Sequence, residues 1–273
     1  MSVEAGYKKL ILEVKSYYES NPLELMNIRY EGGVFDFVWC EGLTDEINLW
    51  TYWQGAGINS PEIMIVGQDF GNCNDDFYVD CVKCSKSDVK KISAEYIKRI
   101  KDNKNNKTDN TLIDLTLKGL GDKYNISIPG NEHVFMTNLC LVYRSVDKIS
   151  GGTYSAYLKH DSLYISKLIR LKKPRAVICL GMDTYHSLLS AFVVERSVFQ
   201  EIGEHFWELL DKGENYKDIP CDDFSFRMYG VSHAGSNGAM NRKKNCTGKD
   251  AEKKSGNDLM IEDWKRIGHF LKA

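Results

Sequence analysis

The sequence predicts an α/β protein with three layers, in which helices cover both faces of a central sheet of four parallel strands. Four short, continuously apolar runs support this prediction, because a strand covered on both faces lacks the alternation of a half-exposed strand. The runs lie at residues 62–66, 133–137, 175–180 and 226–231. Helical apolar periods flank them at residues 3–20, 153–171 and 258–271.

The length of the chain favours a single domain. A chain of 273 residues can bury a large core without a second domain, so we expect one domain over residues 1–273. Within it, residues 1–60 form a helical and aromatic N-terminal segment that packs on the core of residues 61–273.

Charge and hydropathy restrict the partners. The chain has 36 basic and 38 acidic residues and a net charge of −2, so nucleic-acid binding requires a local basic patch. The N-terminus lacks a signal-peptide pattern, and no apolar run approaches the roughly 20 residues of a membrane span. We therefore expect a monomeric, cytoplasmic protein that does not enter membranes.

Polar side chains follow the ends of three predicted strands, at Gln68, Asp69, Asn138 and His233, and the remaining strand ends at Gly181. In open parallel sheets, ligands bind outside the carboxyl ends of the strands, so we expect these residues to share one cleft. A carboxylate, an amide and an imidazole together can orient water, bind a planar ligand and stabilise a developing anion.

Four motifs at these strand ends are similar to those of the uracil-DNA glycosylase superfamily. They are Gly67-Gln68-Asp69-Phe70-Gly71, Thr137-Asn138, the 173–181 run and the Ser232-His233-Ala234-Gly235-Ser236-Asn237 loop. They occur in the family's order and spacing across residues 60–245, which makes the set more specific than any one motif. The resemblance implies a uracil-DNA glycosylase-like fold and an enzyme that hydrolyses the N-glycosidic bond of a flipped-out pyrimidine in DNA, leaving an abasic site.

The resemblance also implies residue roles. Asp69 is expected to activate water, and His233 to stabilise the anionic base oxygen. The expected base-binding residues are Gln68, Phe70, Gly71, Phe77 and Asn138, with Tyr78 as an alternative to Phe77 for stacking on the base. The structural alternatives are that Asp69 caps the following turn and that His233 is a hydrogen-bonded core histidine.

Two departures from the family pattern concern the substrate. Gly71 replaces a bulky aromatic that, in the best-known uracil enzymes, would collide with a substituent on the pyrimidine C5. Ala234-Gly235 replaces the proline-serine pair usual after the motif histidine. The candidate substrates are uracil, oxidised or hydroxymethylated pyrimidines, and hypermodified cytosines of phage DNA, so both DNA repair and phage defence are expected roles.

The expected DNA-binding residues follow the His233 motif. They are Ser236, Asn237, Arg242, Lys243 and Lys244. The last three open a stretch at 242–254 with six basic and two acidic residues, which we expect to contact phosphates. A solvated loop without ligand contacts is the alternative.

The cysteines do not predict a cofactor. Cys81 and Cys84 have metal-ligand spacing and Cys73 lies nearby, so these three are the candidate ligands for an iron–sulfur cluster or zinc. Some members of the superfamily carry a four-cysteine cluster, but their ligands lie before the first motif and after the Asn strand. The pair here also lacks a partner pair, so we expect no cofactor and no bound metal.

Two other classes of function compete with the glycosylase hypothesis. The chain could be a non-catalytic DNA-binding module on the same fold, although Asp69 favours catalysis. It could also be a doubly wound nucleotide-binding protein, but no glycine-rich phosphate-binding motif follows any predicted strand.

Overall fold

The structure, a computed structural model, centres on a mixed sheet of five strands in the order β3-β2-β5-β7-β6. It describes residues 2–20, 35–36, 60–68, 94, 97–98, 101–102, 107–139, 141, 143–144, 155–192, 195–247 and 253–273. The strands are β2 (Ile63–Gly67), β3 (Val134–Asn138), β5 (Ala176–Leu180), β6 (Tyr216–Pro220) and β7 (Ser225–Val231). Separately, β1 (Phe35–Asp36) pairs with β4 (Tyr143–Arg144).

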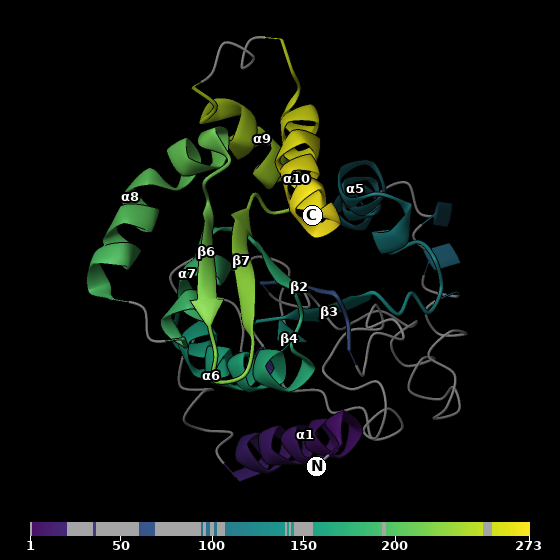
Figure 1. Ribbon diagram of the computed structural model, residues 1–273, viewed down its shortest axis with the longest axis vertical. Helices are drawn as coiled ribbons and strands as arrows, with labels where there is room; N and C mark the ends of the chain where they lie inside the picture. Colours follow the sequence, from purple (N-terminus) through teal and green to yellow (C-terminus); the bar gives the residue numbers. More distant parts are fainter. Residues whose placement is uncertain are drawn as a thin grey trace.

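The sheet has one strand more than the sequence predicted. The four predicted strands are parallel neighbours, whereas β6 pairs with β7 in the antiparallel direction (Figure 1). β6 is an edge strand that carries Lys217 and Asp218 and ends at Pro220. Charges and proline protect exposed strand edges from further pairing, and they also remove the apolar run that marks a strand in a sequence.

Helices cover both faces of the sheet. One face carries α1 (Val3–Ser20), α6 (Ser155–Lys172), α7 (Met182–Ser190) and α8 (Arg196–Lys212). The other carries α5 (Lys107–Asp114), the π-helical turn η2 (Leu115–Leu120) and α10 (Gly256–Lys272), which lie across the sheet from α1 and α6 in Figure 1. The remaining elements are the 3-10 turn η3 (Asp122–Tyr124) and α9 (Ser236–Lys244). Among the helices described, none is both long and apolar enough to cross a membrane.

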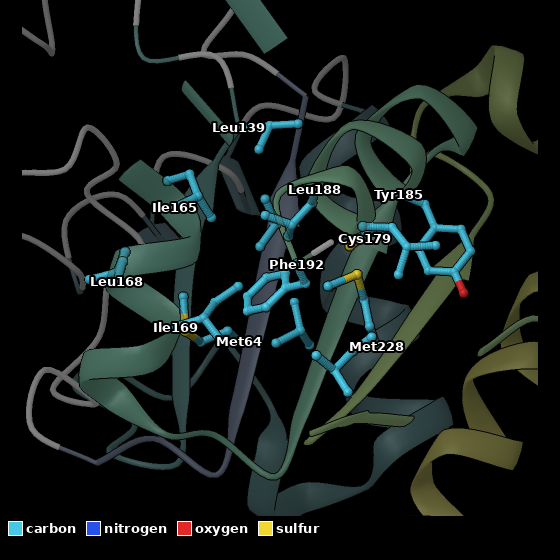
Figure 2. Close-up of a cluster of buried hydrophobic side chains, with 14 of the residues drawn as sticks. Met64, Leu139, Ile165, Leu168, Ile169, Cys179, Tyr185, Leu188, Phe192 and Met228 are labelled. Carbon is cyan, nitrogen blue, oxygen red and sulfur yellow. The ribbon is translucent and has the colours of Figure 1, made fainter. Parts of the chain in front are cut away.

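Alternate side chains of each parallel strand enter two separate cores. Met64, Cys179 and Met228 pack with the α6 and α7 side chains, as Figure 2 shows. Their neighbours Ile65 and Ile178 pack on the opposite face with residues of η2 and α10. All five side chains are fully buried, which explains why these strands read as continuous apolar runs.

The order of the strands creates a switch point between β2 and β5. The connection from β2 to β3 contains α5 and η2 on one face, whereas the connection from β5 to β7 contains α7 and α8 on the other. In open α/β sheets, ligands bind outside the carboxyl ends of strands whose outgoing connections diverge in this way. A ligand is therefore expected near Gly67 and Gly181, at the ends of β2 and β5.

A buried lysine anchors the N-terminal helix beneath the sheet. The side chain of Lys172, at the end of α6, is 2% exposed. Its Nζ lies 4.5 Å from the ring centroid of Tyr7 on α1 and 4.4 Å from that of Phe135 on β3. Burial lowers the pKa of Lys172 from its ordinary value of 10.5 to about 7, and the two aromatic faces offset part of this desolvation.

The Lys172 ammonium should make stability depend on pH. Between pH 7 and 10.5 the unfolded chain holds this proton more tightly than the folded protein, so raising the pH favours folding. We compare the free energy of unfolding of the wild type with that of Lys172→Met. Across this pH window, the wild-type value minus the variant value should rise by up to about 1.4 kcal/mol per pH unit. Urea unfolding at several pH values measures the difference; parallel profiles would contradict the lowered pKa.

Candidate functional site

Two polar side chains lie at the carboxyl ends of the parallel strands, on the sheet face that α5 and α10 cover. Asn138 ends β3 and has the strand parity of Val134 and Met136, which belong to that core. His233 lies two residues beyond the end of β7, whose Tyr229 and Val231 belong to the same core. Both residues therefore lie at the edge of the sheet where the parallel strands have their carboxyl ends.

The two inner strands end in glycine. β2 ends at Gly67 and β5 is followed by Gly181, while the outer strands carry Asn138 and His233. Three inter-strand steps of about 4.8 Å put the ends of β3 and β7 about 14 Å apart. We call these four residues the strand-end site. Its outer members supply hydrogen-bonding side chains and its inner members supply bare backbone, an arrangement that suits a planar ligand.

Gly67 leaves room for the Asn138 carboxamide. The two residues are paired in the parallel register, and the Gly67 carbonyl accepts a 2.8 Å hydrogen bond from the Leu139 N–H. A Cβ at Gly67 would lie 2.1 Å from Asn138 Oδ1, so the carboxamide lies directly over this glycine. Any side chain at position 67 would displace it.

The backbone at Gly181 requires glycine for a different reason. Its φ of 102° lies in the region that side chains disfavour. Its N–H donates to the Val231 carbonyl at 2.8 Å, which ties the end of β5 to the end of β7. Among the described residues, the nearest atom to a Cβ at Gly181 would be His233 Cβ at 3.9 Å, an ordinary van der Waals distance.

The loop after β7 sets the tautomer of His233. The Gly235 N–H donates to His233 Nδ1 at 2.9 Å, so a neutral ring carries its proton on Nε2. Glycines allow this tight loop: a Cβ at Gly235 would lie 3.0 Å from Nδ1, and one at Gly238 would lie 1.8 Å from the His233 carbonyl oxygen. The ring is therefore prepared to donate a hydrogen bond from Nε2.

Several predicted site residues fall outside the described part of the chain. They are Asp69, Phe70, Gly71 and Phe77, and the candidate metal ligands Cys73, Cys81 and Cys84. Gln68 is described, directly after β2 and partly buried. In the ranges that the structure describes, no three His, Cys, Asp or Glu side chains are grouped to hold a metal ion.

No protein-family model matches the chain, and no curated protein is significantly similar to it.

Ser236 and Asn237 open a helix, not the loop expected from the sequence. They are the first residues of α9, whose N-cap is Gly235. Ser236 lines a hollow of about 520 Å³ between α9 and α5. Lys101, Lys107 and Asn257 also line this hollow. Residues 101–111 have no apolar period and are typical of a surface loop, so no pattern in the sequence assigns these two lysines to a site.

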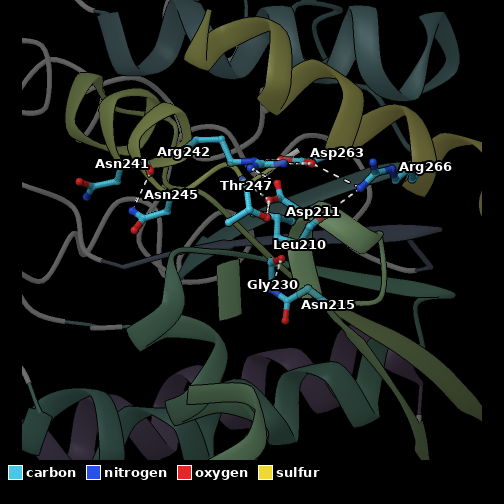
Figure 3. A network of polar contacts seen from close by, with 10 residues as sticks. All are labelled: Leu210, Asp211, Asn215, Gly230, Asn241, Arg242, Asn245, Thr247, Asp263 and Arg266. Atoms are coloured by element: carbon cyan, nitrogen blue, oxygen red, sulfur yellow. Dashed lines mark hydrogen bonds and ion pairs between the residues drawn. The ribbon is translucent and has the colours of Figure 1, made fainter. Parts of the chain in front are cut away.

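Arg242 does not fit the predicted contact with DNA phosphate. Its side chain is 2% exposed and forms two hydrogen bonds with Asp263, at 2.7 and 3.0 Å, and one with Asp211 at 2.6 Å (Figure 3). Asp211 also accepts from the Thr247 N–H at 2.7 Å. Burial alone would raise the pKa of Asp211, but these hydrogen bonds outweigh it and lower the pKa. Arg242 therefore joins α8, α9 and α10 inside the protein.

The two neighbouring lysines remain at the surface side of α9. Lys243 is partly buried and its Nζ donates to the Lys254 carbonyl at 2.6 Å, whereas Lys244 is exposed. Of the three basic residues, Lys244 is thus the best placed to meet a phosphate.

Replacing Arg242 should destabilise the fold. Arg242→Met leaves the buried Asp263 and the partly buried Asp211 without the cation that they share, which costs about 3–5 kcal/mol. Urea unfolding should show this loss, with no comparable loss in Lys244→Met. A second change, Asp263→Leu, should recover part of the loss in Arg242→Met because it removes one of the unpaired charges. A stable Arg242→Met protein with weakened DNA binding would restore Arg242 as a phosphate contact.

Proposed function

We propose that the chain is a DNA glycosylase that excises uracil or a C5-modified pyrimidine, as the resemblance to the uracil-DNA glycosylase superfamily implies. One observation carries the proposal: Asn138 and His233 flank two glycine strand ends at the switch point of the sheet. A pyrimidine turned out of the DNA stack is a planar ligand with hydrogen-bonding groups on its edges, which the strand-end site suits.

His233 stabilises the departing base. As the bond between the base nitrogen and the sugar C1′ breaks, its electron pair stays with the base and places negative charge on the neighbouring carbonyl oxygen. The Nε2–H of His233 donates to that oxygen, in the tautomer that the Gly235 N–H selects. A fixed donor aimed at a developing anion contributes about 10²–10³ in rate.

Asn138 binds the hydrogen-bonding edge of the base. Its carboxamide offers both an acceptor oxygen and a donor NH₂, the complement of a pyrimidine carbonyl and ring nitrogen. The carboxamide lies over Gly67, where no side chain displaces it. An incorrect base would leave its donor or its acceptor unpaired.

Asp69 completes the reaction. It directly follows Gln68 in the chain, and its carboxylate accepts a proton from water while the water oxygen bonds to C1′. Its negative charge also offsets the positive charge that develops on the sugar ring. The products are a free base and an abasic site, and neither an oxidant nor a metal takes part in this scheme.

The direct test is incubation with DNA panels that carry uracil, oxidised, hydroxymethylated or glycosylated pyrimidines. Mass spectrometry of the released base and alkaline cleavage at abasic sites detect excision. We expect both signals for at least one pyrimidine. A hypermodified cytosine would indicate defence against phage genomes, and uracil alone would indicate repair. The absence of excision from every panel would leave the non-catalytic DNA-binding alternative.

Substitution of His233 should slow excision without preventing folding. We expect His233→Ala to lower the single-turnover rate about 10²–10³-fold, because the donor to the anionic oxygen is lost. His233→Gln should recover part of the rate, since its amide can donate from a similar position. The matched control is His269→Ala on the exposed side of α10, with no change expected. Equal rates for all three variants would exclude His233 from catalysis.

Gly71 should determine tolerance of C5 substituents. Gly71→Tyr restores a bulky side chain, and overfilling a packed site costs about 1–3 kcal/mol. We expect the variant to lose the C5-substituted pyrimidine while it retains uracil, with wild-type rates for the substituted base equal to or above those for uracil. Parallel losses of both substrates would refute this account of Gly71.

A further inference from the structure

We infer that a trough along α9 holds the sugar–phosphate backbone of the DNA strand that carries the target base. This inference rests on the proposed function and specifies how the substrate strand reaches the strand-end site. The trough consists of two adjoining hollows along α9. They share Ala239 and Asn257 in their walls, so they lie next to each other on the surface.

The first hollow connects the trough to the strand-end site. Gly235, which donates to His233 Nδ1, lies in its wall together with Ser236. Lys101 and Lys107 line the opposite side, on the α5 side of the hollow. A strand in this hollow would therefore pass directly beside the catalytic histidine, within reach of the site for an extruded base.

The second hollow, of about 500 Å³, continues past α9 toward the start of α10. Met240, Lys243 and Lys244 line it on the α9 side, and Ser255 and Gly256 on the α10 side. The side chain of Met240 is 62% exposed. It offers the faces of unpaired bases an apolar contact beside Lys243 and Lys244, which line the same hollow.

The charge of the trough contrasts with that of the whole chain. Among the described residues, four lysines and one aspartate line the two hollows, while the chain as a whole carries a net charge of −2. That aspartate, Asp114, forms an ion pair with Lys118 at 2.9 Å. A group of lysines on a protein of nearly balanced charge matches the phosphate backbone of a nucleic acid, and an adjacent apolar contact matches a single strand.

The test measures salt-dependent binding of a fluorescein-labelled single-stranded oligonucleotide that contains only ordinary bases. We expect Lys101→Gln, Lys107→Gln and Lys244→Gln each to weaken binding and to lower the slope of log Kd against log salt by about 0.7. The matched controls are Lys9→Gln on α1 and Lys159→Gln on α6, exposed lysines across the sheet that should change neither quantity. Thermal unfolding verifies that each variant is folded.

A strand of the same sequence with neutral methylphosphonate linkages separates backbone contacts from base contacts. It should bind the wild type weakly and show no difference between the wild type and the trough variants. Unchanged salt slopes with the phosphodiester strand, or equal losses in the α1 and α6 controls, would overturn the inference. This binding assay does not depend on excision of a base. A slope of log Kd against log salt that is lower in the trough variants than in the wild type would therefore support the trough even if every excision assay failed.

Discussion

The strand-end site depends on the register of four parallel strands that are buried on both faces. A slip of one residue in β3 would turn Asn138 to the opposite face and would also exchange Phe135 and Met136 between the two cores. Packing in the two cores therefore fixes the register of the strands, and the register determines where Asn138 and His233 lie at the sheet edge. The large apolar surface buried by β2, β3, β5 and β7 positions two side chains that contribute little to stability themselves.

Close backbone packing refines this positioning. Gly67 gives the Asn138 carboxamide its place, and Gly235 and Gly238 allow the loop after β7 to fold back on His233. Functional groups held by packing and by backbone hydrogen bonds lose less freedom when a ligand binds. These positions require glycine because a side chain there would collide with Asn138 or His233.

The sequence was informative where local patterns decide the structure. Continuous apolar runs predicted the four parallel strands, and the 3.6-residue period predicted α1, α6 and α10. The residues at the strand ends followed from these strands by the general rule for open sheets. The edge strand β6 was missed because its charged residues and its proline carry no apolar pattern.

The prediction failed where distant residues decide the structure. The helix α9 has no apolar face of its own and forms against α10, where Gly256 lets the backbone of Ala239 approach. Arg242 reads as a surface cation in a basic stretch, but Asp211 and Asp263, 31 and 21 positions away, draw it into the interior. A single sequence gives no indication of that pairing, so the expected DNA-binding set included one cation that the fold buries.

The most direct test of the central claim is NMR of the histidine side chains in ¹⁵N-labelled protein. DNA with a 2′-fluorinated target nucleotide resists cleavage and holds the base in place. The account predicts an Nε2-protonated His233 in the free protein, and a shift of its Nε2 and of the Asn138 NH₂ signals on binding, while His133 and His269 stay unchanged. A His233 ring protonated on Nδ1, or signals of His233 and Asn138 that do not respond to the DNA, would contradict it.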